Sequence, residues 1–344
     1  MYYDVLNALA MLGVVFMHFN GIVHMYAPSI EGPWRQSLVV ECVFYWAVPI
    51  FFMISGATLM GYRERYDTAT FFKKRALRVV VPWLAWSVIC LVWKVATAQM
   101  EPPMGPRTFV NMLLNNQIEV VYWFFLPLFS IYLCMPLLSL LADPARARRN
   151  ERVMWYAVGV TFVLVSLLPC LCRSVGIRWN PDLGFPMLAG YLIFPVLGYL
   201  LSRTEFTRAQ RWAIYALGLF GLALRFIGTL VLTDAGGKLD ERLWEYTNFP
   251  CVLLSVAVFV AAKNIPWDRL FRTARARRGL ANVAGASFGI YLVHMIVFWG
   301  FQQVTHLPET SPVWRWAMPL LAYAVCLAIV LVLKRVPGVR RILP

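Results

Sequence analysis

Long apolar runs separated by short polar segments dominate this chain. A run of about 20 apolar residues is long enough to cross the hydrocarbon core of a membrane as an α-helix. We therefore predict an all-α, polytopic integral membrane protein with about ten transmembrane helices, of which the eighth is the shortest. The predicted segments are residues 4–26, 39–61, 79–98, 120–141, 153–171, 184–201, 212–232, 248–262, 284–303 and 313–334.

The basic residues between these segments predict the orientation of the chain. Of the 32 lysines and arginines, 23 fall in the even-numbered gaps and in the segment after the last helix, whereas 7 fall in the odd-numbered gaps. Cytoplasmic loops of membrane proteins carry the excess of positive charge. We therefore expect both termini to be cytoplasmic, which agrees with an even number of helices.

The overall composition supports the same class of protein. Of the 344 residues, 60% are hydrophobic and 14% are charged, compared with about 25% charged residues in soluble domains. We expect one transmembrane domain over residues 1–344, in contact with membrane lipid and without a soluble accessory domain. The net charge of +15 lies in short loops, which indicates membrane topology rather than a nucleic-acid partner.

Several kinds of site have no signature in the sequence. The seven cysteines lack the paired spacing of a disulfide framework or a zinc site. The chain contains no glycine-rich phosphate loop and no HExxH motif. We expect no metal, and the sequence leaves the oligomeric state open.

Three polar residues in the first predicted helix suggest a functional stripe. Asn7 and His18 are eleven residues apart, close to three helical turns, and therefore share a face, with Asp4 about 40° away. Ionisable groups inside a membrane are costly and by default mark function. A polar stripe that starts at the cytoplasmic end suits a reactive group reached from that side, so His18 is a candidate catalytic residue.

The ninth predicted helix carries a second histidine near its middle, His294, with Tyr291 one turn before it. Two interpretations stay open for His294: a chemical role, or a hydrogen bond to the carbonyl of a neighbouring helix. His24 and His306 lie near predicted external ends, where a histidine meets water at little cost. We expect no special role for these two.

Further ionisable residues lie in or near the apolar runs. Glu41 and Lys94 are close to external ends, where their charged groups can extend to the interface. Arg225 lies deeper, so we expect it to need an acidic partner, which the sequence does not identify.

Other segments allow two interpretations each. Arg75 and Arg78, three residues apart in a basic segment, anchor the topology or bind phosphate with their planar guanidinium groups. On a regular helix, this spacing would place both on one face. Ser55 and Gly56 permit close helix packing or form part of a site. The aromatic run that contains Trp123 forms an interfacial belt or lines a site.

Five short motifs occur in a fixed order along the chain. They are His18 in the first helix, the segment from Val48 to Gly56, the Arg75-x-x-Arg78 pair before Pro82 and Trp83, the Trp123-Phe124 start of a helix that closes near Pro136, and the segment from Phe288 to His294. In this combination the chain resembles membrane acyltransferase family 3, the polytopic bacterial O-acyltransferases that modify surface glycans. The resemblance spans nearly the whole chain.

The resemblance implies a function and roles for residues. It implies transfer of an acyl group, most simply acetyl, from cytoplasmic acetyl-CoA to a hydroxyl of an extracytoplasmic or lipid-linked glycan in the bacterial inner membrane. His18 and His294 would then be catalytic. Arg75, Arg78 and Asn7 would bind the coenzyme, and Tyr291, Trp123 and Ser55 would contact the substrate.

One position departs from the family pattern. The family places an arginine eleven residues before the histidine of the first helix, where this chain has Asn7, which forms hydrogen bonds but carries no charge. Another basic residue then substitutes, or the donor is handled differently, or activity is lost. A secondary transporter is the main alternative function, although no pair of repeated, broken helices is visible.

Overall fold

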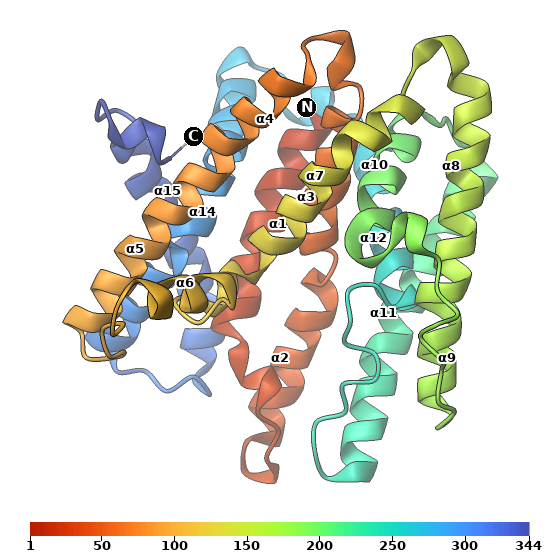
Figure 1. Cartoon of the computed structure of the whole chain (residues 1–344). Helices are drawn as coiled ribbons and strands as arrows, with labels where there is room; N and C mark the ends of the chain where they lie inside the picture. Colours follow the sequence, from red (N-terminus) through yellow and green to blue (C-terminus); the bar gives the residue numbers. More distant parts are fainter. Residues whose placement is uncertain (344) are drawn as a thin grey trace.

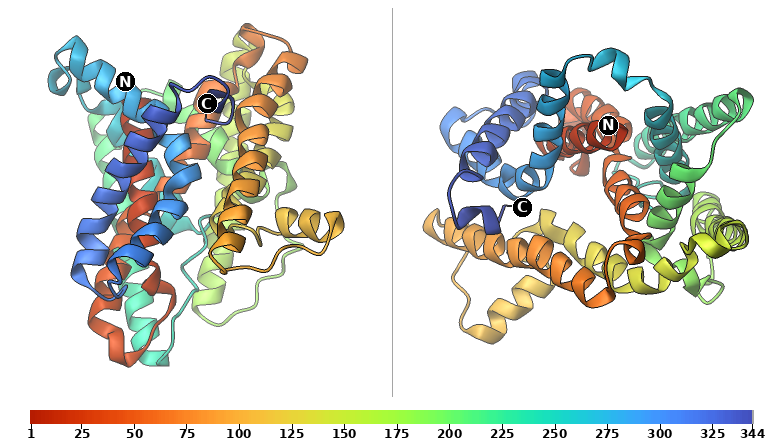
Figure 2. Two further views of the ribbon diagram at one scale, coloured as in Figure 1. Left: turned by 90° about the vertical axis from the view of Figure 1, so that its left-hand side faces the viewer. Right: turned by 90° about the horizontal axis from the view of Figure 1, so that it is seen from above.

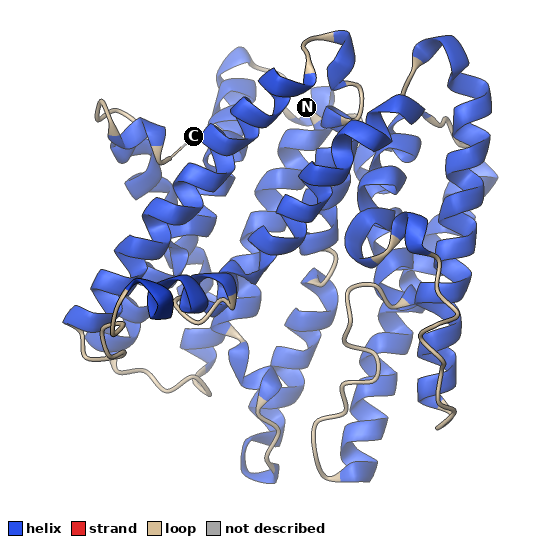
Figure 3. Ribbon diagram, in the orientation of Figure 1, coloured by secondary structure: helices blue, strands red, loops and turns tan. Residues whose placement is uncertain are grey.

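The structure is a computed structural model that describes residues 1–343 and consists of helices joined by loops (Figure 3), with no strand in that part of the chain. Eight helical runs within residues 1–343 are long and apolar enough to cross a membrane. The prediction of an all-helical, multi-spanning protein is therefore confirmed. Figure 1 shows most of these helices running side by side along one common direction, with both termini at the same end.

The eight long runs coincide with eight of the ten predicted segments, although several extend beyond them. They are Tyr2–Phe19, Pro28–Glu64, Thr68–Ala96, Val120–Leu141, Pro144–Ser174, Arg208–Gly236, Ala274–Thr305 and Val313–Leu333. The extensions contain charged residues such as Lys73 and Arg278. Such residues are good helix formers, so a helix continues into water where an apolar pattern ends.

The other two predicted segments are shorter helices. The segment at 184–201 forms 3₁₀ turns at Pro186–Leu188 and Gly190–Leu192, followed by the helix α10 (Ile193–Arg203). The segment at 248–262 corresponds to α12 (Phe249–Asn264), which has 16 residues. The estimate of about ten membrane helices therefore resolves into eight long helices and two shorter ones within residues 1–343.

Regular capping explains several helix ends. Asp67 accepts a hydrogen bond from the backbone N–H of Thr70 and starts α4 (Thr68–Arg75). Hydrogen bonds from Thr70 hold the pKa of Asp67 below its ordinary value. Thr207 and Gln210 form a capping box at the start of α11 (Arg208–Gly236), which ends at Gly237 with a positive φ of 63°.

Prolines shape the helices next to the site. Helix α2 (Glu31–Phe44) and helix α3 (Ala47–Leu59) are separated at Tyr45 and Trp46. Pro49 has no N–H to donate to the carbonyl of Tyr45, four residues earlier, and that carbonyl accepts a weak hydrogen bond from the thiol of Cys251 instead. Pro82, near the start of α5 (Val81–Ala96), also has no N–H to donate, and it follows a wide π-helical turn at Ala76–Val80.

The helices differ in how deeply they are buried. The runs that contain α1 (Tyr2–Phe19), α3 and α14 (Ala274–Thr305) are buried over 56%, 78% and 56% of their apolar windows, whereas the runs of α11 and α15 (Met318–Leu333) are buried over 22%. Seen from above, α1 lies inside a ring formed by the other helices (Figure 2). The apolar side chains of the outer helices therefore suit contact with lipid, and the inner helices are placed to carry a site.

The remaining helices complete the bundle. Figure 1 shows α6 lying across the general direction of the bundle. These helices are α6 (Pro106–Leu114), α7 (Phe125–Leu141), α8 (Ala147–Thr161), α9 (Leu168–Ser174) and the four-residue α13 (Trp267–Leu270).

Candidate active site

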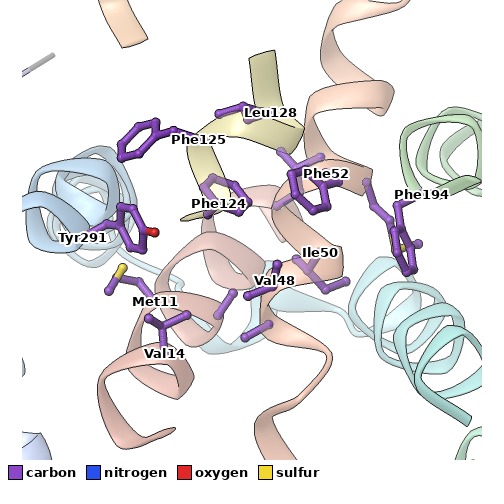
Figure 4. Packing of buried hydrophobic residues seen from close by; sticks show 14 of the residues in the cluster. Met11, Val14, Val48, Ile50, Phe52, Phe124, Phe125, Leu128, Phe194 and Tyr291 are labelled. Atoms are coloured by element: carbon purple, nitrogen blue, oxygen red, sulfur yellow. The ribbon is translucent and has the colours of Figure 1, made fainter. Parts of the chain in front are cut away.

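A cavity of about 510 Å³ lies between α1, α3, α7 and α14. Side chains that are far apart in the sequence line it: Asn7 and His18 from α1, Ser55 from α3, and Tyr291 from α14. Figure 4 shows part of this region, where Met11 and Val14 of α1, Phe124 beside α7, and Tyr291 come together from separate elements. We call this space the central cavity.

One face of α1 forms a wall of the central cavity along much of its length. Asn7, Met11, Val14 and His18 all line the cavity, and their spacing of four, three and four residues is that of one helical face. The predicted stripe that joins Asn7 to His18 is therefore present, and the two residues are about 16 Å apart along the helix axis. Asp4 is not among the residues that line this cavity.

The two predicted histidines are neighbours. The ring centroids of His18 and His294 are 5.0 Å apart, although the residues come from helices at opposite ends of the sequence. His18 lines the cavity, whereas His294 lies directly behind the lining and is fully buried. The sequence suggested each histidine separately but carried no signal that they meet.

The hydrogen bonding of His294 defines its tautomer. Its Nδ1 lies 2.6 Å from the carbonyl oxygen of Tyr291, and because a carbonyl only accepts, Nδ1 must donate the proton. A neutral ring then carries its lone pair on Nε2. This buried Nε2 has no hydrogen-bond partner among residues 1–343. The bond of His294 is therefore to a carbonyl of its own helix, α14, and not to a neighbouring helix as the structural interpretation expected, while its second nitrogen has no protein partner within residues 1–343.

Two tyrosines hold the segment before α7 against α14. The hydroxyl of Tyr122 donates to the carbonyl of Leu292 at 2.7 Å, and the hydroxyl of Tyr291 donates to the carbonyl of Val121. Both bonds are buried, so breaking either one would leave a tyrosine hydroxyl without this partner in an apolar environment. The ring of Tyr291 lines the cavity while its hydroxyl serves this structural link.

The two arginines of the basic segment are placed differently. Arg75 lines the central cavity, and its guanidinium lies 5.7 Å from the ring centre of Tyr132. Arg78 is exposed and does not line the cavity. The expectation that both share a face is wrong for this helix, because the π-helical turn at Ala76–Val80 changes the angle between them.

Arg75 is the only lysine or arginine among the described residues that line the central cavity. Its Nε is buried and has no hydrogen-bond partner within residues 1–343. Asn7, which stands at the position of the family arginine, lines the same cavity. The cavity therefore contains a basic residue, Arg75, although Asn7 stands where the family has an arginine.

The pair Ser55–Gly56 serves two purposes. Ser55 lines the central cavity. A Cβ atom added at Gly56 would overlap the carbonyl of Pro195 in α10, and one added at Gly198 would overlap the carbonyl of Met53 in α3. The backbones of α3 and α10 therefore touch, which requires glycine at both positions.

The other end of the cavity brings Glu41 and His24, which were expected to lie near external helix ends, together with three aromatic residues that the sequence did not single out. Glu41, His24, Tyr45, Trp244 and Tyr246 line it. His24 was expected to be unremarkable, yet its ring packs against that of Trp244 at 4.9 Å. Trp123 also lines the cavity and stacks on Tyr246 at 5.5 Å, which places it inside the protein rather than in an interfacial belt.

Glu41 is the acidic partner that Arg225 was expected to need. Their charged groups are 3.7 Å apart, and the residues are 5% and 1% exposed. Glu41 therefore does not extend to the interface as predicted. Lys94 also has a buried partner, since its ammonium lies 3.0 Å from the carboxylate of Glu119. The sequence did not reveal these pairs, because the partners are far apart along the chain and meet only when separate elements pack together.

A cluster of potential metal ligands was also sought in the described part of the chain. No group of three or more histidine, cysteine, aspartate or glutamate side chains is positioned to hold a metal ion within residues 1–343. The polar groups that line the central cavity instead include two histidines, an amide, a guanidinium, a carboxylate and several hydroxyls. This set suits proton transfer and the binding of an anionic group.

Comparison with known proteins identifies the family. A family model described as an acyltransferase domain, that of membrane acyltransferase family 3, matches residues 2–333. The chain belongs to this family and is a multi-spanning membrane acyltransferase. No curated protein and no solved structure matches the chain. Membership of the family favours acyl transfer over the alternative of a secondary transporter.

Proposed function

We propose that the protein transfers an acetyl group from cytoplasmic acetyl-CoA to a hydroxyl of an extracytoplasmic or lipid-linked glycan in the bacterial inner membrane. The observation that carries this proposal is the central cavity, which contains Arg75, its one arginine among the described residues, and His18, with the buried His294 directly behind His18. Arg75 and His18 both line this space of about 510 Å³. Family membership supports the acyl transfer itself.

Arg75 is the proposed anchor of the donor. Coenzyme A carries several phosphate groups, and a guanidinium binds phosphate oxygens through two parallel hydrogen bonds. Arg75 then provides the positive charge that Asn7 cannot, and Asn7 contributes hydrogen bonds from the same cavity. Arg78, which is exposed, is left to interact with solvent or the membrane surface.

His18 is the proposed general base. It accepts the proton of the acceptor hydroxyl while the hydroxyl oxygen forms the new bond to the acyl carbon and the carbon–sulfur bond breaks. The protonated His18 then returns the proton to the leaving thiolate, so the step balances. The ordinary pKa of imidazole, about 6.5, leaves the neutral base available near pH 7.

His294 is the proposed positioning residue for His18. Its Nδ1 is held by the carbonyl of Tyr291, which leaves Nε2 as an acceptor close to the ring of His18. In the proposed reaction His18 donates a hydrogen bond to this Nε2, which has no partner within residues 1–343, and the bond favours the tautomer of His18 whose other nitrogen carries the lone pair. Tyr291, Trp123 and Ser55 then provide the walls against which the reacting groups lie.

The sidedness of the reaction tests the proposal. Inverted membrane vesicles expose the cytoplasmic face, whereas right-side-out vesicles expose the outer face. Labelled acetyl-CoA added to inverted vesicles should give labelled glycan, and the same donor added to intact right-side-out vesicles should give none. Equal labelling in both preparations, or labelling only in the right-side-out vesicles, would contradict a cytoplasmic donor.

A further inference from the structure

A second cavity, of about 530 Å³, lies beside the end of the central cavity that contains Glu41 and His24. We call it the outer cavity. Its lining residues are Tyr45, Arg173, Gly190, Tyr191, Glu241, Trp244, Glu245, Tyr246 and Thr247. Three of these residues, Tyr45, Trp244 and Tyr246, also line the central cavity. The two cavities are therefore separated by a partition of three aromatic side chains.

The partition is built from stacked rings. Tyr45 and Tyr246 stack at 4.1 Å with an angle of 6° between their planes, and Trp123 stacks on Tyr246 from the central cavity. Behind the partition, the guanidinium of Arg225 lies over the ring of Tyr45 and pairs with Glu41. Arg225 therefore fixes Tyr45 and Glu41 relative to each other, on the wall between the two cavities.

One polar atom of the partition lacks a partner. The indole Nε1 of Trp244 is buried and forms no hydrogen bond with any of residues 1–343. A buried donor normally finds a partner, and an unsatisfied one costs free energy. Trp244 lines both cavities, so the oxygen of a bound molecule would be able to accept this hydrogen bond.

The outer cavity has a different charge from the end that contains Arg75. Glu241 and Glu245 line it, and Arg173, the one basic residue among its described lining residues, is paired with Glu245 at 2.8 Å. Glu41, on the central side of the partition, is paired with Arg225, so the net negative charge of this region comes from Glu241. This arrangement repels anions, whereas Arg75 attracts them.

We propose that the outer cavity and its aromatic partition bind the acceptor, and that they select a neutral or amino sugar over an acidic one. This inference rests on the proposed function, because it assigns the acceptor of the same transfer reaction. Aromatic faces pack against the apolar face of a sugar ring, and the Trp244 indole and tyrosine hydroxyls bond to its hydroxyl groups. The acidic residues of the outer cavity also repel the polyanionic donor, which Arg75 attracts to the opposite end of the central cavity.

The experiment uses two soluble probes of the same shape, methyl glucoside and methyl glucuronide, with the purified full chain in lipid nanodiscs. Binding is measured by saturation-transfer NMR, and transfer is measured separately as acceptor-dependent release of coenzyme A from acetyl-CoA. We expect methyl glucoside to bind on the order of tenfold more tightly than methyl glucuronide. Trp244→Leu should weaken binding of methyl glucoside roughly tenfold without changing the affinity for acetyl-CoA.

Charge reversal provides the variant that keeps the fold. Glu241 and Glu245 are exposed, so the double variant Glu241→Lys/Glu245→Lys should remain folded and should remove or reverse the preference for the neutral probe. Asp182→Lys is the matched control, because Asp182 is an exposed acidic residue that lines neither cavity. It should leave the preference unchanged.

The outcomes separate this inference from the proposed function. Equal binding of both probes, no saturable binding of either, or an equal effect of Asp182→Lys would overturn the assignment of the outer cavity, even if acetyl transfer is intact. Selective binding of the neutral probe without any release of coenzyme A would instead refute the proposed function and leave the sugar site standing.

Discussion

Replacement of Arg75 by glutamine tests how the donor is held. Arg75 is the only lysine or arginine among the described residues that line the central cavity, and its Nε has no partner within residues 1–343. Glutamine keeps hydrogen-bonding capacity but removes the charge. We expect Arg75→Gln to raise the KM for acetyl-CoA while changing kcat little, because its proposed role is to bind the phosphates of the donor and not to take part in the chemical step.

The magnitude follows from the environment of the guanidinium. A hydrogen bond to a charged group contributes about 1.5–3 kcal/mol, which corresponds to a change of about 10- to 150-fold in affinity. Arg75 is partly exposed, so solvent weakens its attraction to a phosphate compared with a fully buried pair. We therefore expect an increase near the lower end, about 10- to 30-fold.

The assay compares two variants and two donors. Arg78→Gln is the matched control, because Arg78 is three residues away, exposed and outside the cavity; we expect it to change KM less than about twofold. Acetyl-pantetheine lacks the phosphates of coenzyme A, so its KM should be the same for the parent and Arg75→Gln. An equal loss in both variants, or a loss that persists with acetyl-pantetheine, would refute the role of Arg75 as a phosphate anchor.

Three further predictions concern stability and the histidine pair. Glu41→Gln leaves the buried charge of Arg225 without its partner and should lower the free energy of unfolding by about 3–5 kcal/mol, measured by denaturant titration in detergent. Recovery of stability in the double variant Glu41→Gln/Arg225→Met would support the pairing. Additive losses of stability in the double variant would contradict it. Gly198→Ala should force α3 and α10 apart and lower the melting temperature, whereas Gly159→Ala, where a Cβ meets nothing, should not. His294→Phe keeps the ring but removes Nε2, so kcat should fall about 10- to 100-fold with KM unchanged; an unchanged kcat would show that His294 is only structural.

The sequence predicted the class of fold because the signal for a membrane helix is its own composition. Each apolar run must satisfy its backbone internally, so length and hydropathy are enough to place a long helix. The same signal fails for α10, which has 11 residues and follows 3₁₀ turns. Its place against α3 depends on backbone contact at Gly56 and Gly198, which no hydropathy pattern reports.

The candidate site was predictable only in part. Helical spacing on α1 correctly joined Asn7 to His18, because that geometry lies within one helix. The pairing of His18 with His294, and of Glu41 with Arg225, depends on how separate helices pack. Arg75 and Arg78 were expected to act together, and the π-helical turn after Arg75 separates them. Pro82 was the one visible sign of that irregularity.

The location of each terminus relative to the membrane stays a prediction of the charge pattern. The two termini and α4, which belongs to a strongly basic segment, lie at the same end of the bundle in Figures 1 and 2. This arrangement agrees with the alternation of charge along the loops.

The central claim is that His18 performs the chemistry, and the most direct test is acetyl transfer from labelled acetyl-CoA to membrane glycan at matched expression. His18→Asn is compared with His306→Asn, since His306 lies outside the cavity in a left-handed conformation that asparagine tolerates. We predict that His18→Asn loses about 10²- to 10⁴-fold in transfer rate, while His306→Asn retains the parent rate. Full transfer by His18→Asn in a correctly folded protein would contradict the account.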